Sequence, residues 1–186
     1  SILENYEDVF GHLGTCVNYG SNPSTSQLQD EKTLAFVKKH FNSITMENEM
    51  KPDYIMDKAA SIARLDTYKE HVAVNFNACK NGLDFAKENG ISVRGHVLVW
   101  HSQTPDWFFY ENYDTNGQLA GRDLMLKRME NYIKDVIAYT ETNYPGVIYA
   151  WDVVNEAIAD PWGIGLEAGE ASPMRQKDSL WYQTIG

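Results

Sequence analysis

Residues 72–100 read VAVNFNACKNGLDFAKENGISVRGHVLVW, and this stretch decides the fold. Its first part carries apolar residues at spacings of 4, 3, 4 and 3, which predicts one apolar face of a helix. These residues are Val72, Phe76, Cys79, Leu83 and Ala86. Gly90 follows as a natural helix stop, and residues 91–100 then show the aliphatic and aromatic content of a strand.

The same succession of helix and strand patterns extends in both directions from this stretch. Runs rich in Val, Ile and aromatic residues predict strands at four places. These runs are Leu13 to Asn18, Phe41 to Glu47, Ile91 to Trp100 and Val147 to Glu156. Helical patterns separate them, a weak one from Gln27 to His40 after a cap-like run over residues 21–26, and a strong one from Met125 to Thr140. Strands that alternate with helices predict a parallel sheet with helices outside, either a doubly wound sheet or a (β/α) barrel.

The segment after the first strand distinguishes these two architectures. Residues 19–23 read YGSNP and contain neither glycine-rich pattern of phosphate-binding loops. We therefore favour an α/β fold of the (β/α)₈ TIM barrel type. Such a barrel needs eight βα units and about 250 residues. Residues 1–186 hold four predicted strands and reach the opening of a further helix at residues 180–186, so the chain is expected to supply roughly the first four units. Four units alone would leave a long unpaired edge, and we do not expect them to form an independently stable fold.

The third predicted strand has two different faces. A period of two places four residues on a face that suits a helical layer, namely Val93, Gly95, Val97 and Val99. The other face carries Arg94, His96, Leu98 and Trp100. In a barrel this second face points inward, and His96 and Trp100 lie toward the C-terminal end, where barrel enzymes keep their chemistry. Acidic residues at the ends of the second and fourth strands, Glu47 and Glu156, are expected to converge on the same cleft.

The composition is that of a globular domain and narrows the class of partner. The 186 residues include 16 Lys and Arg against 26 Asp and Glu, a formal net charge of −10. This charge and the lack of a basic run argue against nucleic acid or an anionic membrane as a partner. No apolar stretch approaches the roughly 18 residues that span a bilayer, and residues 1–10 lack the pattern of a signal peptide. Cys16 and Cys79 cannot form a disulfide framework, and each lies in an apolar run that predicts a buried thiol.

Three polar strings stand out, and each has an ordinary structural interpretation when taken alone. The string TMENEMK at residues 45–51 can be a charged turn. The string RGHVLVWHSQ at residues 94–103 can be a buried strand whose histidines have their hydrogen bonds satisfied. The string WDVVNEA at residues 151–157 can be a strand with a solvated end. A metal site is disfavoured, because His96 and His101 are five residues apart and have opposite parity on a strand. An acid beside an amide at a buried strand end is costly without a function.

Taken together, the three strings resemble glycoside hydrolase family 10, the endo-β-1,4-xylanases. They occur in the family's order and at suitable spacing, and the resemblance runs from about Asn5 to the last residue. It implies that residues 1–186 are the N-terminal half of a catalytic barrel that cleaves xylan internally with retention of configuration. It also implies that no metal or organic cofactor takes part.

The resemblance assigns roles to most polar residues of these strings. Glu156 matches the general acid/base at the end of the fourth strand, and Asn155 matches the residue that binds the sugar 2-hydroxyl beside the scissile bond. His101 and Asp152 are interpreted as supports for residues that touch the substrate. The remaining matches contact sugar: Glu47, Asn48 and Lys51 the second sugar on the non-reducing side, and His96, Trp100 and Gln103 the reactive sugar.

The chemistry explains why a carboxylic acid is needed at the position of Glu156. Departure of a sugar alkoxide needs a proton donor, and burial against Trp100 and a nearby carboxylate would keep Glu156 protonated near neutral pH. A retaining mechanism also needs a second carboxylate about 5 to 5.5 Å away as nucleophile. The family places that residue on the seventh strand, and no residue of this chain matches it. Glu47 and Glu49 are rejected as substitutes, because the resemblance places Glu47 in sugar binding.

Three accounts of the missing nucleophile are open. The chain is a fragment of a larger enzyme, or a separate polypeptide such as a C-terminal fragment completes the barrel, or an inserted module interrupts the domain. We favour the first two together over the third.

Two other functions compete with a xylanase. One is a non-catalytic xylan-binding half barrel, which the missing nucleophile and the intact sugar-contacting set favour. The other is a related β-1,4-glycanase that acts on cellulose or mannan. Glu47, Asn48 and Lys51 favour xylose, because they crowd the place where a hydroxymethyl group would lie.

Two further expectations concern the loop after the fourth strand and the location of the protein. Trp162 in that loop is either a platform for the leaving-group sugar or a residue that packs the loop. Xylan is too large to enter a cell, so the resemblance implies a protein that is secreted or held at the cell surface. Xylan and xylo-oligosaccharides are the expected partners.

Overall fold

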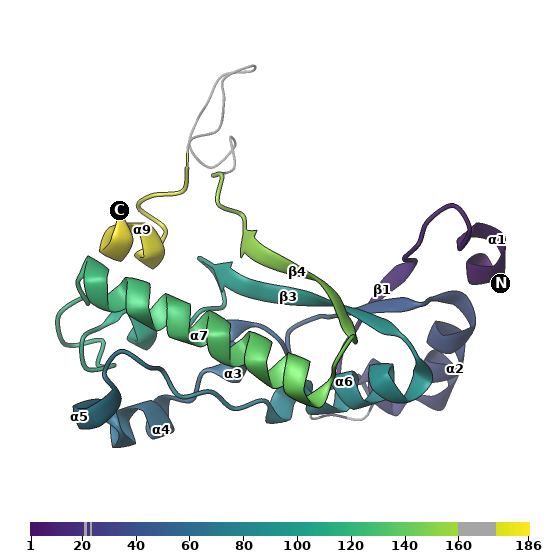
Figure 1. Ribbon diagram of the computed structural model, residues 1–186, viewed down its shortest axis with the longest axis horizontal. Helices are drawn as coiled ribbons and strands as arrows, with labels where there is room; N and C mark the ends of the chain where they lie inside the picture. The colour runs from purple at the N-terminus through teal and green to yellow at the C-terminus, as the bar shows by residue number, and fades with distance from the viewer. Residues whose placement is uncertain (21, 23, 160–173) are drawn as a thin grey trace, which may run out of the picture.

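The computed structural model describes residues 1–20, 22, 24–159 and 174–186. Its centre is a parallel sheet of four strands in the order β1-β2-β3-β4, so each strand lies beside the one that precedes it in the chain (Figure 1). The strands are β1 (Gly14–Val17), β2 (Ser43–Met46), β3 (Ser92–Trp100) and β4 (Ile148–Asn155). All four predicted strands are confirmed, each shorter than predicted by a few residues at most.

Helices α2 (Glu31–His40), α6 (Asn77–Asn89) and α7 (Arg122–Asn143) lie on one side of the strands in Figure 1. Asp30 caps α2, because its side chain accepts the Thr33 N–H at 2.8 Å. Gly90 ends α6 with φ 64°, the left-handed conformation that glycine adopts most easily. The predicted helix at residues 27–40 is divided, since η1 (Gln27–Gln29) precedes the Asp30 cap.

The start of α6 differs from the prediction. Val72 and Phe76 continue the apolar spacing of the helix, but they lie before its first residue. The segment that contains them is not helical, and Val74 forms an antiparallel bridge with Met56. The contact between Val74 and Met56 therefore overrides the helical spacing, and α6 begins later than the spacing predicts.

Short helices that the sequence pattern did not indicate occupy the connections. They are α1 (Ile2–Tyr6), α3 (Pro52–Ile55), α4 (Lys58–Ala63), α5 (Leu65–Tyr68) and η2 (Asp106–Phe109). The helix expected at residues 180–186 is present as α9 (Leu180–Ile185). Within the described ranges, no helix combines the length and apolar character needed to cross a bilayer.

Strand β3 carries an irregularity that changes its faces. His96 lies opposite Asp152 but Val99 lies opposite Val154, so β3 uses one residue more than β4 over this interval. Leu98 is consequently 2% exposed and belongs to the apolar cluster under α7. The prediction that Leu98 faces inward with His96 is therefore wrong.

Two apolar clusters fill the space between sheet and helices. One joins the strands to α2 and α6 through residues such as Val37, Ile44 and Leu83. The other lies between β3, η2, α7 and α9 and includes Phe108, Met125 and Tyr132. Trp151 of β4 packs against both clusters, and it covers Gly95 so closely that an added Cβ would lie 2.3 Å from Trp151 Cε3.

The two cysteines have different environments. Cys79 of α6 is 1% exposed, as predicted, and burial raises the pKa of its thiol to about 12. Cys16 of β1 is exposed, so the prediction of a buried thiol is wrong for this residue. Its strand alternates in burial, and Cys16 lines a cavity together with His96 and Asp152.

Helix α7 buries a charged residue in its apolar face. Arg128 is 0% exposed, and its guanidinium donates to four carbonyl oxygens at 2.7 to 2.9 Å. These acceptors are the carbonyls of Lys69, Phe108, Tyr110 and Glu111. Arg128 thus fastens the two loops that precede α7 to the helix.

Candidate active site

The polar residues predicted to bind or react with substrate lie at the carboxyl ends of the strands. Glu47 follows β2, Trp100 ends β3, and Glu156 follows β4. Because the strands are parallel, these ends share one edge of the sheet, which is where barrel enzymes place their chemistry.

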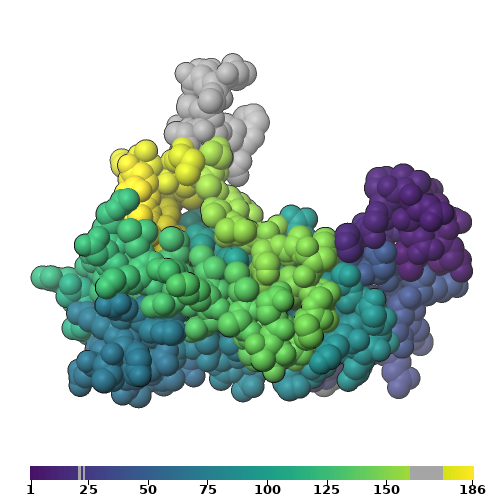
Figure 2. All heavy atoms as spheres, in the orientation of Figure 1, coloured from purple at the N-terminus to yellow at the C-terminus, as the bar shows by residue number. Residues whose placement is uncertain are grey.

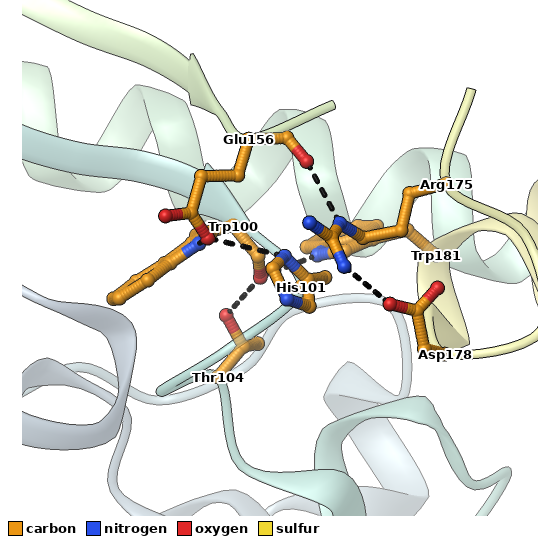
Figure 3. Close-up of polar contacts among 7 residues, drawn as sticks. All are labelled: Trp100, His101, Thr104, Glu156, Arg175, Asp178 and Trp181. Carbon is orange, nitrogen blue, oxygen red and sulfur yellow. Dashed lines mark hydrogen bonds and ion pairs between the residues drawn. The ribbon is translucent and has the colours of Figure 1, made fainter. Parts of the chain in front are cut away.

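Glu156 and Trp100 are joined directly. The Trp100 indole Nε1 donates a hydrogen bond of 2.8 Å to Glu156 Oε2 (Figure 3). The Glu156 side chain is 51% exposed, so the expectation that Trp100 would bury the carboxyl group is not met by the described residues. Instead, Trp100 orients the group with a hydrogen bond from the neighbouring strand.

Lys51, Asn48 and Gln103 form a hydrogen-bonded group beside Trp100. The Lys51 ammonium donates to Asn48 Oδ1 at 3.0 Å and to Gln103 Oε1 at 2.6 Å, and Gln103 Nε2 donates to Asn48 Oδ1 at 3.2 Å. Lys51 is 8% exposed, and its Nζ lies 5.1 Å from the centre of a Trp100 ring, a cation–π distance. The predicted sugar-binding residues of two strand ends are thus connected to Trp100 and through it to Glu156.

The two acidic residues after β2 have different surroundings. Glu47 is exposed and accepts a hydrogen bond of 2.9 Å from Asn18 Nδ2. Glu49 is 5% exposed and accepts the main-chain N–H groups of Tyr19 at 2.7 Å and Asn48 at 3.0 Å. Glu49 therefore ties the loop after β2 to the loop after β1, whereas Glu47 presents its carboxylate at the surface.

His96 and Asp152 face each other across β3 and β4 on the face opposite the helices. Asp152 Oδ2 lies 2.9 Å from His96 Nδ1, and Asp152 Oδ1 accepts from Arg94 Nε at 2.9 Å. Burial alone would raise the pKa of Asp152, but the hydrogen bonds from Arg94 and His96 outweigh it and lower the pKa. These residues line a cavity of about 290 Å³ together with Cys16 and Glu47.

His101 lies beside the acid. Its Nδ1 is 3.9 Å from Glu156 Oε2, too long for a hydrogen bond, and this buried nitrogen has no hydrogen-bond partner among the described residues. Burial lowers the pKa of His101, the Arg175 guanidinium lowers it further, and Glu156 and Asp178 oppose this effect. Burial and Arg175 therefore favour the neutral form of His101.

Asn155 lies next to Glu156 at the end of β4. It is partly buried and lines a largely apolar cavity of about 240 Å³ with Trp100, His101 and Glu156. The structure thus brings Asn155 to the same place as the predicted acid. Trp162 lies outside the described residues.

Three residues that the sequence analysis did not single out hold this region. The Trp100 carbonyl accepts from Trp181 Nε1 at 3.1 Å and from Thr104 Oγ1 at 2.7 Å. Arg175 Nε donates to the Glu156 carbonyl at 3.0 Å (Figure 3). Their acceptors are main-chain atoms, and a side-chain motif carries no signal for such contacts.

The arrangement places the Glu156 carboxyl group next to the Trp100 indole, with the polar groups of Lys51, Asn48 and Gln103 on the other side of that indole. No group of three or more His, Cys, Asp or Glu side chains that could hold a metal ion occurs within residues 1–20, 22, 24–159 and 174–186. The Glu156 carboxyl group is hydrogen-bonded and half exposed, and a group of this kind is able to give or take a proton.

Comparisons with known proteins identify the family that the chain resembles. Residues 1–186 match the family model described as Glycosyl hydrolase family 10. Endo-1,4-beta-xylanase B of Butyrivibrio fibrisolvens is 43% identical over 148 residues, which cover 80% of this chain and 21% of the relative.

Solved structures give the same result. One match is the N-terminal endo-1,4-beta-D-xylanase 10B of Clostridium thermocellum, whose structure contains CBM22-1 and GH10 modules complexed with xylohexaose. The TM-score is 0.75 and the sequence identity 35%, and the match covers 92% of this chain and 32% of the other chain. A xylanase from Paenibacillus barcinonensis matches with a TM-score of 0.72 and 34% identity over 100% of this chain and 45% of its own. The chain thus spans less than half the length of these relatives, and the likeness confirms the predicted barrel fold class.

Proposed function

Because the chain belongs to glycosyl hydrolase family 10, we propose that it supplies the first four βα units of an endo-1,4-β-xylanase. The observation that carries this proposal is the connection from Lys51 through Trp100 to Glu156, which joins predicted sugar-binding groups to a single reactive carboxyl group. The names of the relatives, several of them xylanases, support the choice of substrate.

We propose that the reaction proceeds by double displacement with retention of configuration. A nucleophilic carboxylate bonds to the anomeric carbon while Glu156 gives its proton to the departing sugar oxygen, so the glycosidic bond breaks as the enzyme–sugar bond forms. Glu156, now a carboxylate, then takes a proton from water. The water oxygen bonds to the anomeric carbon, and the nucleophile leaves as a carboxylate.

The substrate-binding residues of this proposal fall into two sets. Glu47, Asn48 and Lys51 would hold the second sugar on the non-reducing side, and the pre-formed bonds of Asn48 and Lys51 reduce the entropy lost on binding. The second set, His96, Trp100, Gln103 and Asn155, would surround the reactive sugar. Asp152 would fix the orientation of the His96 ring, and His101 would lie beside Glu156, where burial and Arg175 favour its neutral form.

The nucleophile is proposed to come from outside residues 1–186. A denaturing intact-mass spectrum of the protein purified from its source tests this point first. A longer chain or a second polypeptide is expected. A single species at 21.2 kDa that still hydrolyses xylan would contradict the proposal, because the whole reaction would then be performed by this chain.

The role of Glu156 is tested by Glu156→Ala in the complete protein. Activity on xylan should fall by about a hundredfold to ten-thousandfold, the usual contribution of a general acid. A dinitrophenyl β-xylobioside should still form the enzyme–sugar intermediate, because dinitrophenolate leaves without a proton. Azide, which needs no base, should then release β-xylobiosyl azide. Wild-type activity on xylan in this variant would refute the assignment.

The same assays separate the competing functions. Xylo-oligosaccharide binding by the wild-type protein without any cleavage would favour a carbohydrate-binding protein. Faster hydrolysis of carboxymethylcellulose or mannan than of xylan would favour a related glycanase.

We also propose that the protein is exported, because xylan cannot enter a cell. Fractionation of the source organism tests this proposal, and the protein should be detected in the medium or at the cell surface.

A further inference from the structure

Arg175 makes two separate contacts with the backbone that carries Glu156. Its main-chain N–H donates to the Ala157 carbonyl at 2.8 Å, and its Nε donates to the Glu156 carbonyl at 3.0 Å. Figure 3 shows the guanidinium lying between the Glu156 carbonyl oxygen and Asp178. Glu156 is therefore held at its side chain by Trp100 and at its main chain by Arg175.

The backbone at Glu156 needs such support. Its φ is 51°, in the left-handed region that a residue with a side chain seldom occupies. Conformations of this kind persist where the surrounding contacts determine them, and they cluster at functional sites. Here the conformation sets the direction in which the side chain leaves the end of β4, and therefore where the carboxyl group lies.

The Arg175 side chain is itself fixed in place. Its Nη1 pairs with Asp178 Oδ2, and the side chain is only 16% exposed. Trp181, on the helix that follows the same segment, bonds the Trp100 carbonyl at 3.1 Å. One segment, residues 174–181, thus reaches both members of the Trp100 and Glu156 pair through their main-chain atoms.

We propose that Arg175 is a positioning residue for Glu156, which aligns the carboxyl group with the departing sugar oxygen by holding the Glu156 main chain. This inference rests on the proposed function of Glu156 as the acid/base. Arg175 touches neither substrate nor reacting atoms in this proposal. Its effect should therefore be confined to the steps in which Glu156 moves a proton.

The test compares Arg175→Met with wild type in the complete protein on two substrates. With xylan, whose leaving oxygen needs the proton, kcat/KM should fall by about 30-fold, within the range known for misplaced catalytic groups. With a dinitrophenyl β-xylobioside, whose leaving group needs no proton, kcat/KM should stay within about twofold, since its first step makes no use of the acid. An equal loss on both substrates, or no loss on xylan, would overturn the proposal.

Two more variants complete the design. Lys177→Met removes a nearby exposed cation, whose ammonium makes no hydrogen bond or ion pair in the part of the chain that the structure describes, and it should leave both activities unchanged. Arg175→Lys keeps one donor and the charge, and its loss on xylan should be smaller, about fivefold, because a lysine cannot bridge two acceptors in the fixed geometry of arginine. If Arg175→Met fails to fold, Arg175→Lys provides the test. A loss of kcat/KM on xylan without a loss on the dinitrophenyl β-xylobioside supports the proposal, and an equal loss on both substrates, or no loss on xylan, overturns it.

Wild type and Glu156→Ala are measured alongside. An inactive wild type, or an active Glu156→Ala, would count against the proposed function and not against Arg175 alone. The alternative outcome is that Glu156→Ala loses activity on xylan, but the ratio of kcat/KM on xylan to kcat/KM on the dinitrophenyl β-xylobioside is the same in Arg175→Met as in wild type. This outcome would overturn only the positioning role of Arg175.

Discussion

Trp100 donates its indole N–H to Glu156 across the ends of two neighbouring strands, with 2.8 Å between Nε1 and Oε2. The main chain of Trp100 is fixed as well, because its carbonyl oxygen accepts hydrogen bonds from both Thr104 and Trp181. A strand other than its own therefore contributes to the orientation of the carboxyl group. This relationship gives Trp100 a second role besides the sugar contact predicted for it.

Trp100→Phe separates these two roles. Phenylalanine keeps an aromatic face near Lys51 but cannot donate to Glu156, so we expect kcat on xylan to fall by about tenfold through loss of alignment, with KM nearly unchanged. Steady-state kinetics of the complete protein measure both constants. A higher KM with an unchanged kcat would show that Trp100 acts in sugar binding only.

The charge of His101 should depend on Arg175. Burial first and Arg175 second lower the pKa of His101 below its ordinary value of 6.5. The folded protein then binds fewer protons at His101 than the unfolded chain, so the stability associated with the neutral ring is fully present above about pH 6.5 and is lost as the pH falls through the folded pKa. An NMR titration of the His101 ring should give a midpoint below this value, and Arg175→Met should raise it. A midpoint that matches wild type, as expected for the control Lys177→Met, would contradict the role of the Arg175 charge.

Gly95 should be irreplaceable for reasons of packing. An added Cβ would meet the Trp151 ring at 2.3 Å, and the ring is fixed between two apolar clusters. Gly95→Ala should therefore lower the free energy of unfolding by about 2 kcal/mol, measured by urea denaturation. Gly11→Ala is the matched control, since an added Cβ meets nothing within 4 Å there. Equal effects of the two substitutions would refute the packing argument.

Arg128 should be essential for stability despite its distance from the predicted acid. Arg128→Met leaves four carbonyl oxygens without their buried donor, and we expect a loss of about 3 kcal/mol in the free energy of unfolding. Lys134→Met on the same helix removes only an exposed pair with Glu130 and should change stability little. Urea denaturation curves of the two variants provide the test, and similar midpoints would contradict the prediction.

Most of the sheet could be predicted from the sequence because a strand shows its period locally. The predicted run Ile91 to Trp100 became Ser92–Trp100, and Val147 to Glu156 became Ile148–Asn155. Leu98 was assigned to the wrong face, because the extra residue of β3 is defined only by its pairing with β4. Such a register change depends on a second strand and leaves no local signal.

Apolar spacing also overestimated the length of α6. Val72 and Phe76 fit the helical period, and both pack in the apolar cluster around η2 and α7. The bridge from Val74 to Met56 keeps the residue between them out of the helix. The pattern shows which residues are buried. It does not show by which backbone conformation they reach the core.

The residues of the candidate site also fall into those that the sequence indicates and those that only the fold reveals. Glu47, Asn48, Lys51, Trp100 and Glu156 were selected by the side-chain strings, and the structure places them along one edge of the sheet. Arg175 follows Glu156 by 19 residues and acts on a carbonyl oxygen, which every residue type possesses. Recognition of this contact requires the folded backbone.

The order of strands described above has a consequence for synthesis. Because each strand pairs with its immediate predecessor, the sheet can grow as the chain emerges from the ribosome, and each new strand finds its partner already in place. Among the described residues, β4 has a strand on one side only, and Figure 2 shows part of the β4 region at the surface of the molecule. Tyr149, Val153 and Val154 of this strand are 40, 53 and 58% exposed. An apolar edge of this kind pairs readily with any extended segment. The uncovered edge of β4 can therefore pair with an extended segment of another copy of the chain.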